Sequence, residues 1–413
     1  MTYPFVLGDI EYAPETAFAE TSTTFATHRI NAIGPPDVSG LKHDKEPVGN
    51  IKAYMHDDQE YVLMGQSGTF DITLDATGHG ATMVGSPTID ALETFLGYVF
   101  GNVSASLPAS TTLTGGTATA PTTTASGTFP AGGLCRIGAA GDARGNGQFH
   151  RIGTHAATTL NLLTGMNDTP TNGDVLYPAT NFYFHETAFG HGINASVPGL
   201  RFRFLTPGLQ YTCHGCAPVG LKLSGLSAGQ RPQWTITYEV SRWSAVTGGT
   251  FPSAVTKNQY NPSSVARGSL FVNTVGTATR ATRNARELTL DITLGMTMLP
   301  SHGTVGQYQK WGACTRMPSS VKWSWIEDAD AAATATPVIQ TYGTAGTPKH
   351  ILLTLSSADG SAVGLYSPNV RVSSVATPFN HNGVQSVRFE GMACTGPTKT
   401  NDLTASMLVA AYS

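Results

Sequence analysis

The stretch Thr69-Phe70-Asp71-Ile72-Thr73-Leu74-Asp75 decides the fold class, because its apolar residues alternate with polar ones. A period of two sends successive side chains to opposite faces of a β-strand. Several later segments repeat this pattern, and turns rich in Gly, Pro, Asn and Ser separate them. The pattern predicts a mainly β protein of antiparallel sandwiches or barrels. The later segments are residues 200–204, 221–224, 234–240, 288–294, 321–325, 351–355, 370–372 and 387–389.

One α-helix is expected shortly after this strand. Ser86-Pro87 offers an N-cap followed by Pro at the first helical position. The helix should end near Gly101 and flank a sheet, because its apolar residues fall on one stripe at helical spacing. The stripe consists of Ile89, Leu92, Phe95, Leu96 and Val99.

The composition points to a subunit of a large assembly. Only 12% of the 413 residues are Asp, Glu, Lys or Arg, against roughly 25% in an ordinary soluble domain. Proteins that work alone usually keep a well-charged surface for solubility. The formal net charge of −3 also lacks the basic footprint of a protein that grips nucleic acid.

The residues after Met1 lack the basic and apolar regions of a signal peptide, and no stretch has the length of an apolar membrane span. We therefore expect a soluble protein that is made in the cytoplasm. An odd number of cysteines argues against a disulfide framework, so all five are expected to be reduced. These are Cys135, Cys213, Cys216, Cys314 and Cys394.

Two segments are expected to contact other subunits. Residues 1–58 have no period and suggest an N-terminal arm that finds its partners elsewhere. The Thr-, Ala- and Gly-rich insertion at residues 103–134 has too little apolar area to order itself. A neighbouring subunit would order it; the alternative is a loop held against its own domain. The candidate interface residues are Tyr3, Phe5, Val6, Leu107 and Phe129.

An internal echo indicates a duplicated β unit. Residues 215–224 and 312–324 both contain Pro-x-x-apolar-Lys-x-Ser after a Gly and a Cys. A first β domain at residues 59–246 and a second at 247–413 would follow from it. A chance match is the alternative for so short a motif.

The motif Gly225-Leu226-Ser227-Ala228-Gly229 fits the nucleophile elbow of hydrolases. That elbow requires a strand followed by a helix, whereas residues 230–234 lead into a predicted strand. A hairpin turn is the better interpretation, and no catalytic residue is expected.

Metal and phosphate sites are weakly supported. Cys213-x-x-Cys216, with His214 between, has no second ligand pair at zinc-site spacing. His185-Glu186 and His191 do not form H-E-x-x-H. The glycine clusters at residues 78–80 and 138–147 lack the Lys and Ser or Thr of a phosphate loop. We expect no metal and no cofactor.

Several aromatic residues alternate with polar ones and could form a platform for sugars. The same alternation favours core packing, with some indole N–H groups paired. These residues are Phe202, Phe204, Trp234, Trp323 and Trp325.

The order of segments resembles that of the tail tube proteins of long-tailed bacteriophages. The resembling parts are residues 67–74 with the following helix, residues 211–216 leading into the strands at 221 and 234, and residues 365–372. They span much of residues 60–413, as patterns of strands and turns rather than an invariant signature. The first 58 residues and the Thr-rich insertion have no counterpart in it.

The resemblance implies a β-sandwich or barrel with a flanking helix, whose sheets join between subunits around a hollow tube. It implies homo-oligomeric rings, hexameric or trimeric, that stack with other phage tail proteins into a conduit for DNA ejection. The protein would then be a virion structural protein without enzymatic activity, assembled in the host cytoplasm, with no membrane partner. DNA would pass without specific binding, so the lumen should be neutral or acidic.

Two other classes stay open. A capsid, decoration or baseplate protein would share the low charge and the β content. A β-rich glycan-binding module or hydrolase would prefer a secretion signal and convergent acid groups, and the sequence shows neither.

Overall fold

The computed structural model describes residues 10–20, 25, 29–30, 37–47, 61–76, 91–101, 109–125, 129–138, 148–166, 168–184, 199–206, 209–227, 230–248, 264–278, 282–283, 285–300, 311–316, 319–328, 347–356, 362–375, 379–395 and 403–412. The described chain is mainly β, as expected, with one α-helix, α1 (Ala91–Phe100). No described helix has the length and apolar character needed to cross a membrane.

The strands before residue 180 are β1 (Ile10–Pro14), β2 (Arg29–Ile30), β3 (Lys42–Pro47), β4 (Tyr61–Asp75), β5 (Thr111–Thr117), β6 (Ala120–Thr123), β7 (Leu134–Gly138), β8 (Gln148–Ala156), β9 (Thr159–Leu162) and β10 (Val175–Tyr177). Those up to residue 300 are β11 (Thr180–Phe184), β12 (Leu200–Thr206), β13 (Leu209–Ser224), β14 (Gln233–Val240), β15 (Arg242–Thr247), β16 (Ser264–Thr274), β17 (Thr282–Arg283), β18 (Ala285–Thr293) and β19 (Met296–Pro300). The remainder are β20 (Trp311–Arg316), β21 (Ser320–Asp328), β22 (Lys349–Ser356), β23 (Ala362–Val375), β24 (Phe379–His381), β25 (Val384–Ala393) and β26 (Leu408–Tyr412).

A sheet of seven antiparallel strands forms the centre of the molecule, in the order β4-β14-β13-β18-β21-β25-β23. The predicted alternation is confirmed on it. Ile72, Ile236, Leu290, Trp323 and Phe389 are each at most 1% exposed and share one core, whereas their sequence neighbours point away from it.

Two long strands bend and join this sheet to its neighbours. The first half of β13 pairs with β12 and β15, and the second half pairs with β14 and β18. Likewise, the first half of β23 pairs with β22 and β26 before the strand joins β25. Pro218 and Pro368 lie near these changes of partner, where a residue without an N–H group interrupts a ladder at least cost. The sequence predicted only residues 221–224 of β13, because Gly215 and Pro218 mask the strand pattern.

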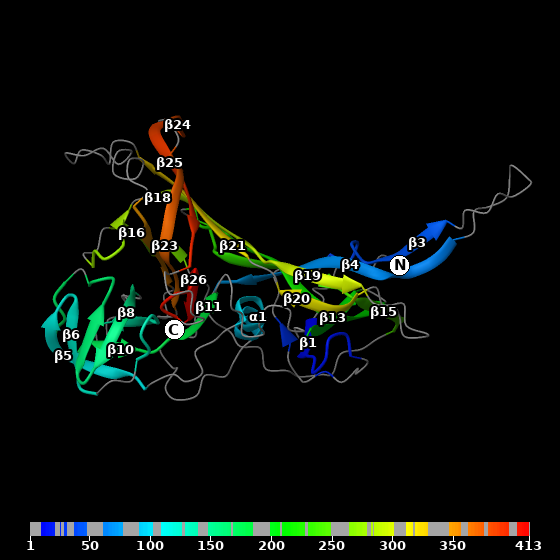
Figure 1. Cartoon of the computed structure of the whole chain (residues 1–413), viewed down its shortest axis with the longest axis horizontal. Coiled ribbons are helices and arrows are strands. Elements are labelled where there is room, and N and C mark those ends of the chain that lie inside the picture. The colour runs from blue at the N-terminus through cyan, green and yellow to red at the C-terminus, as the bar shows by residue number, and fades with distance from the viewer. Residues whose placement is uncertain are drawn as a thin grey trace, which may run out of the picture.

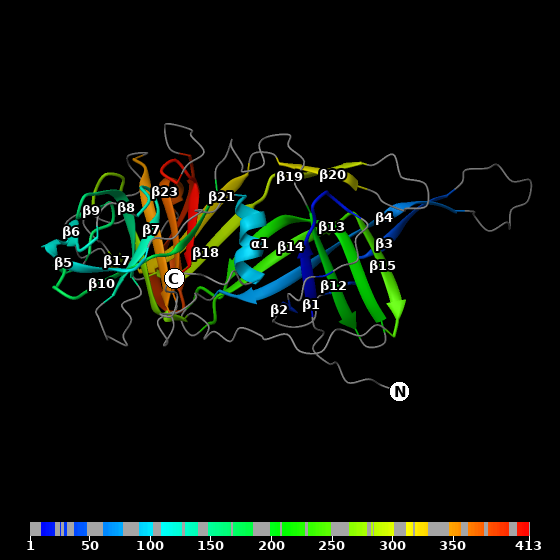
Figure 2. The same ribbon diagram turned by 90° about the horizontal axis from the view of Figure 1, so that it is seen from below.

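Helix α1 covers the apolar face, as predicted (Figure 2). Phe95 contacts the rings of Tyr12, Phe202 and Tyr238 at centroid distances of 4.8, 5.5 and 6.0 Å. The helix ends where expected, because Gly101 follows it with a φ of 78° and donates its N–H to the carbonyl of Gly97 at 2.8 Å. The expected start at residues 86–90 lies outside the described residues.

The Thr-rich insertion corrects one expectation. Its strands β5 and β6 close a six-stranded barrel with β7 to β10 (Figure 1). The insertion thus builds part of a domain within its own chain, and needs no neighbour to order residues 109–125. The sequence missed this because the barrel's apolar residues come from distant segments: Leu113, Phe129, Cys135, Ile137, Ile152, Leu160, Leu162 and Leu176.

The N-terminal arm also finds partners within its own chain. Strand β1 pairs with β12 from Ile10↔Phe204 to Pro14↔Leu200. Ile10 and Tyr12 are 0% and 2% exposed. Residues 10–14 therefore have strand partners in their own chain, and contacts of the arm with other subunits stay a prediction.

The two segments of the internal echo lie on either side of one strand. Residues 221–223 of β13 and 321–323 of β21 both pair with residues 290–292 of β18. Lys222 and Lys322 thus both lie opposite Asp291. The expected units 59–246 and 247–413 accordingly share one sheet through β13 and β18.

Candidate functional site

The face of the seven-stranded sheet that points away from the core is polar. The side chains of Asp71, Lys222, Asp291 and Arg371 are exposed, although their sequence neighbours are buried or half-buried. Among the described residues of this face, Met392 is the exposed large apolar one, at 39% exposure. Most other positions are Thr or Ser: Thr73, Ser224, Thr235, Thr237, Thr289, Thr293, Ser320, Ser324 and Ser373.

The charged side chains of this polar face are interleaved by sign. Lys222, Asp291 and Lys322 occupy directly opposite positions on three adjacent strands. Lys322 Nζ also lies 2.9 Å from Glu390 Oε2 on β25. The charged residues of the described part of the face are the carboxylates Asp71, Asp75, Glu239, Glu287, Asp291, Asp328 and Glu390 and the cations Lys222, Arg231, Arg286, Lys322, Arg371 and Arg388.

Contacts between strands hold several of the remaining side chains in place. Thr73 and Thr235 share a hydrogen bond of 3.1 Å between their hydroxyls. The hydroxyl of Thr237 donates to Asp71 Oδ1 at 2.6 Å, and Arg231 forms an ion pair with Asp75. The face is therefore ordered and nearly neutral.

Part of each edge of this sheet has no partner strand among the described residues. From Phe70 to Asp75, β4 pairs with β14 on one side, and no described segment pairs with its other side, whereas residues 40–41 lie against Gly68 and Thr69. The same holds for residues 371–375 of β23 opposite β25. Unpaired edge strands are hazards in a monomer and natural joints in a polymer.

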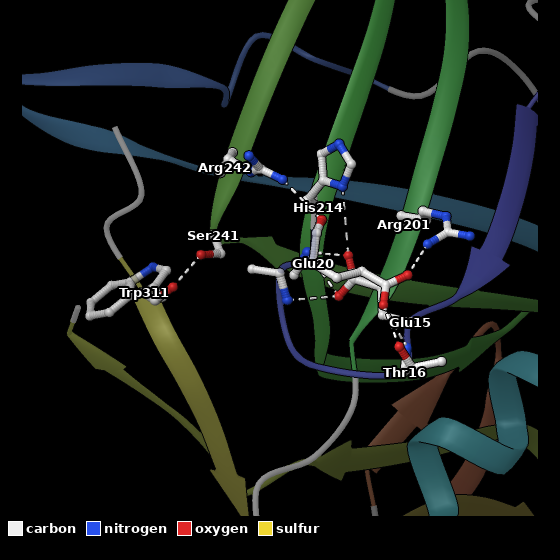
Figure 3. Close-up of polar contacts among 10 residues, drawn as sticks. Glu15, Thr16, Glu20, Arg201, His214, Ser241, Arg242 and Trp311 are labelled. Carbon is white, nitrogen blue, oxygen red and sulfur yellow. Dashed lines mark hydrogen bonds and ion pairs between the residues drawn. The ribbon is translucent and has the colours of Figure 1, made fainter. Parts of the chain in front are cut away.

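A second polar cluster is buried where the N-terminal segment meets β12, β13 and β15 (Figure 3). Glu15 has no exposed side-chain surface. Its Oε1 accepts the N–H of Gly215 at 3.0 Å, and its Oε2 accepts the N–H of Ala19 at 2.9 Å. Glu20 forms an ion pair with Arg201. These contacts fasten residues 15–20 to the sheet.

Burial shifts the titration of this cluster in two directions. Loss of water contact raises the pKa of Glu15 to about 7. Burial, together with the nearby Arg242 and Arg201, lowers the pKa of His214 to about 4. His214 Nδ1 lies 3.8 Å from Glu15 Oε1, which is too long for a hydrogen bond.

The arrangement of this cluster is structural rather than nucleophilic. The nearby Ser241 hydroxyl donates to the carbonyl of Trp311 (Figure 3), whereas a serine nucleophile would be paired with the histidine. Arg242 donates to the carbonyl of Glu20 at 2.9 Å. The cluster thus locks a loop against a sheet. Sequence analysis missed it, because residues 15 and 215 carry no local signal of their proximity.

The predicted interface residues have separate outcomes. Phe129 is 5% exposed and packs inside the small barrel, where its ring lies 5.7 Å from that of His155. Its side chain is thus part of the core of its own chain. Tyr3, Phe5, Val6 and Leu107 lie outside the described residues.

Within the described ranges, no group of three or more His, Cys, Asp or Glu residues could hold a metal ion. Cys213 and Cys216 are buried free thiols. Burial is the main cause that raises the pKa of Cys216 well above its ordinary value, and the hydrogen bond with Cys213 adds to it. The Cys216 thiol therefore stays protonated. His185, Glu186, His191 and the glycines at 78–80 and 139–147 lie outside the described residues.

The hydrolase-like motif occupies a turn, as predicted. It lies between antiparallel strands β13 and β14. Gly225 has a φ of 71°, and Gln230 donates its N–H to the carbonyl of Ser227 at 3.1 Å. Residues 228–229 of the motif lie outside the described residues.

The candidate sugar platform is core, as the alternation favoured. Phe202, Phe204, Trp234, Trp323 and Trp325 are at most 1% exposed. The indole N–H of Trp323 donates to the Ser367 hydroxyl at 2.8 Å, and that of Trp325 donates to Glu327 at 2.9 Å.

No protein-family model matches this sequence, and comparison with curated proteins gives no significant match.

Proposed function

We propose that the chain is the structural subunit of a bacteriophage tail tube. Copies form rings, and the rings stack into a hollow conduit through which DNA passes into the host. The subunit is assembled in the host cytoplasm, joins other tail proteins in the virion, and performs no catalysis.

The observation that carries this proposal is the seven-stranded sheet, which has one apolar face, one polar face and two edge strands that are partly without a described partner. In a protein that stays monomeric, unpaired edge strands promote aggregation and stabilise nothing. In a ring, each edge pairs with the next copy, since head-to-tail contacts must either close or extend indefinitely. The polar face then becomes the inner wall.

The elongated shape supports contacts between rings. Strands β3 and β4 pair from Lys42↔Ser67 to Pro47↔Tyr61 and extend away from the core at one end of the molecule, while the small barrel lies at the other end (Figure 1). A hairpin that leaves its own core suits a contact with another copy along the tube axis.

The test is to express the chain, measure its mass by light scattering, and image it by negative-stain electron microscopy. Hollow rings or tubes of uniform diameter support the proposal. A clean monomer at high concentration, both alone and with tail-tip initiator proteins, argues against it and favours a decoration or glycan-binding role.

A further inference from the structure

The strand register fixes the positions of the two lysines of the polar face, Lys222 and Lys322. Lys222 and Lys322 flank Asp291 at the same level on β13, β18 and β21. In a ring, both lysines recur in each copy, and in stacked rings they recur along the axis. If no carboxylate neutralised these lysines, they would form a row of positive charges along the path of the DNA.

Such a row of charges would hold DNA. Each lysine that neutralises a phosphate releases condensed counterions, and the resulting affinity does not depend on sequence. Retention grows with the number of contacts, so a long conduit would multiply a small affinity per subunit. Passage requires that these cations be occupied by groups of the protein itself.

The carboxylates of this face lie where they can neutralise the two lysines. Glu390 Oε2 contacts Lys322 Nζ at 2.9 Å. Asp291 lies opposite both lysines in the strand register, and opposite charges that face each other on adjacent strands attract. The surrounding positions are mainly Thr and Ser, and the exposed apolar side chain among them is that of Met392, opposite Lys322.

We propose that Asp291 and Glu390 neutralise Lys222 and Lys322, so that a DNA duplex crosses this face without being retained. This proposal rests on the proposed function, because it assigns the face to the inner wall of the conduit.

The test compares the wild type with the double variant Asp291→Asn/Glu390→Gln. Both substitutions keep side-chain size and remove the negative charge. The probe is a labelled mixed-sequence DNA duplex, and its binding is measured by fluorescence anisotropy over a range of salt concentrations. We expect at least tenfold tighter binding at low salt, with a log–log salt slope steeper by about 2 for two freed lysines.

Two further variants test whether the gain in DNA binding comes from the two lysines of the polar face. Asp168→Asn/Asp174→Asn makes the same change in net charge on the small barrel, away from the face, and should leave binding at the wild-type level. Adding Lys222→Gln and Lys322→Gln to the double variant should abolish the gain. Circular dichroism and thermal unfolding confirm that each variant is folded.

Equal binding by the double variant and the barrel control overturns the compensation proposal, even if tubes form. Suppose that the double variant binds DNA more tightly, the barrel control does not, and electron micrographs show no rings or tubes. This result would support the neutralisation of the lysines on this face and would count against the proposed tail tube function. The two proposals therefore fail separately.

Discussion

At the scale of single residues, Glu15 combines full burial with two backbone hydrogen bonds. Because its pKa is raised to about 7 in the folded chain, the folded state holds this proton more tightly than the unfolded state does. Its contribution to stability is complete below about pH 4.5 and is lost as the pH rises through about 7. The corresponding free energy is at most about 3 kcal/mol.

We therefore predict that Glu15→Gln gains stability relative to the wild type as the pH rises from 5 to 8. The amide stays neutral over this range, whereas the wild-type carboxyl loses its proton and becomes a buried charge. Urea unfolding at several pH values measures the difference. Glu20→Gln is the control, because the Thr16 hydroxyl and Arg201 lower the pKa of Glu20. Loss of the Glu20 carboxylate should therefore destabilise the protein. A pH-independent difference between Glu15→Gln and the wild type would contradict the prediction.

Buried tryptophans offer a second test at this scale. Trp323 and Trp234 are both 0% exposed, but only Trp323 has a described partner for its indole N–H, Ser367. Trp323→Phe leaves that hydroxyl without its donor, whereas Trp234→Phe removes a buried N–H that has no described partner.

We expect Trp323→Phe to lower the free energy of unfolding by about 1–2 kcal/mol more than Trp234→Phe does, because a hydrogen bond is lost in one variant alone. Chemical denaturation of both variants measures the difference. Equal losses would mean that the hydrogen bond with Ser367 contributes no net stability.

At the scale of elements, the small barrel is fixed to the sheet of β22, β23 and β26 by close packing. A Cβ at Gly364 of β23 would lie 2.5 Å from the ring of Phe149 on β8. Arg151 of β8 stacks over the ring of Tyr366 at 4.7 Å and donates to the carbonyl of Leu403. The absence of a side chain at residue 364 therefore sets the approach of the two elements.

Gly364→Ala should destabilise the protein by about 1–3 kcal/mol through overpacking. Gly220→Ala is a matched control, because its Cβ would meet Thr237 at an ordinary 3.5 Å. Hydrogen exchange should show faster exchange in the barrel of Gly364→Ala. Unchanged protection in that variant would mean that the barrel docks by other contacts.

The Thr-rich segment also changes how a deletion experiment is designed. A deletion of residues 105–130 within the Thr-rich insertion would remove strands β5 and β6 and open the barrel. The informative deletion is the whole barrel, from residue 109 to residue 177, replaced by a short Gly-Ser linker.

At the scale of the whole molecule, the number of strands sets the size of a ring. Seven strands about 4.8 Å apart and tilted by about 40° span an arc of about 44 Å. Three copies give a backbone radius of about 21 Å and, after about 6 Å of side chains, a bore of about 30 Å. Two copies leave about 16 Å by the same geometry, which is too narrow for a DNA duplex.

We predict three chains per ring, the smallest ring that passes a duplex. Since β4 and β23 run in the same direction and a rotation axis preserves direction, the joint between copies pairs them in parallel. Averaged cryo-electron micrographs and native mass spectrometry count the chains. Six chains per ring would show that only part of this sheet lines the bore.

The sequence by itself determined which side chains lie inside on three strands and on the helix. Alternation in residues 69–75, 234–240 and 288–294 assigned both faces of three strands, and the stripe of Phe95, Leu96 and Val99 assigned the buried face of the helix. These signals are local, because one period of a strand or helix suffices to distinguish its two sides.

Only the tertiary structure decided which strands pair, how the Thr-rich barrel closes, and that Lys222 and Lys322 lie opposite the same residue, Asp291. Glu15 and Gly215 are 200 residues apart in the chain, and no local pattern encodes their contact. The physical reason is that strand pairing joins segments through backbone groups that every sequence carries, so register depends on the packing of the whole sheet.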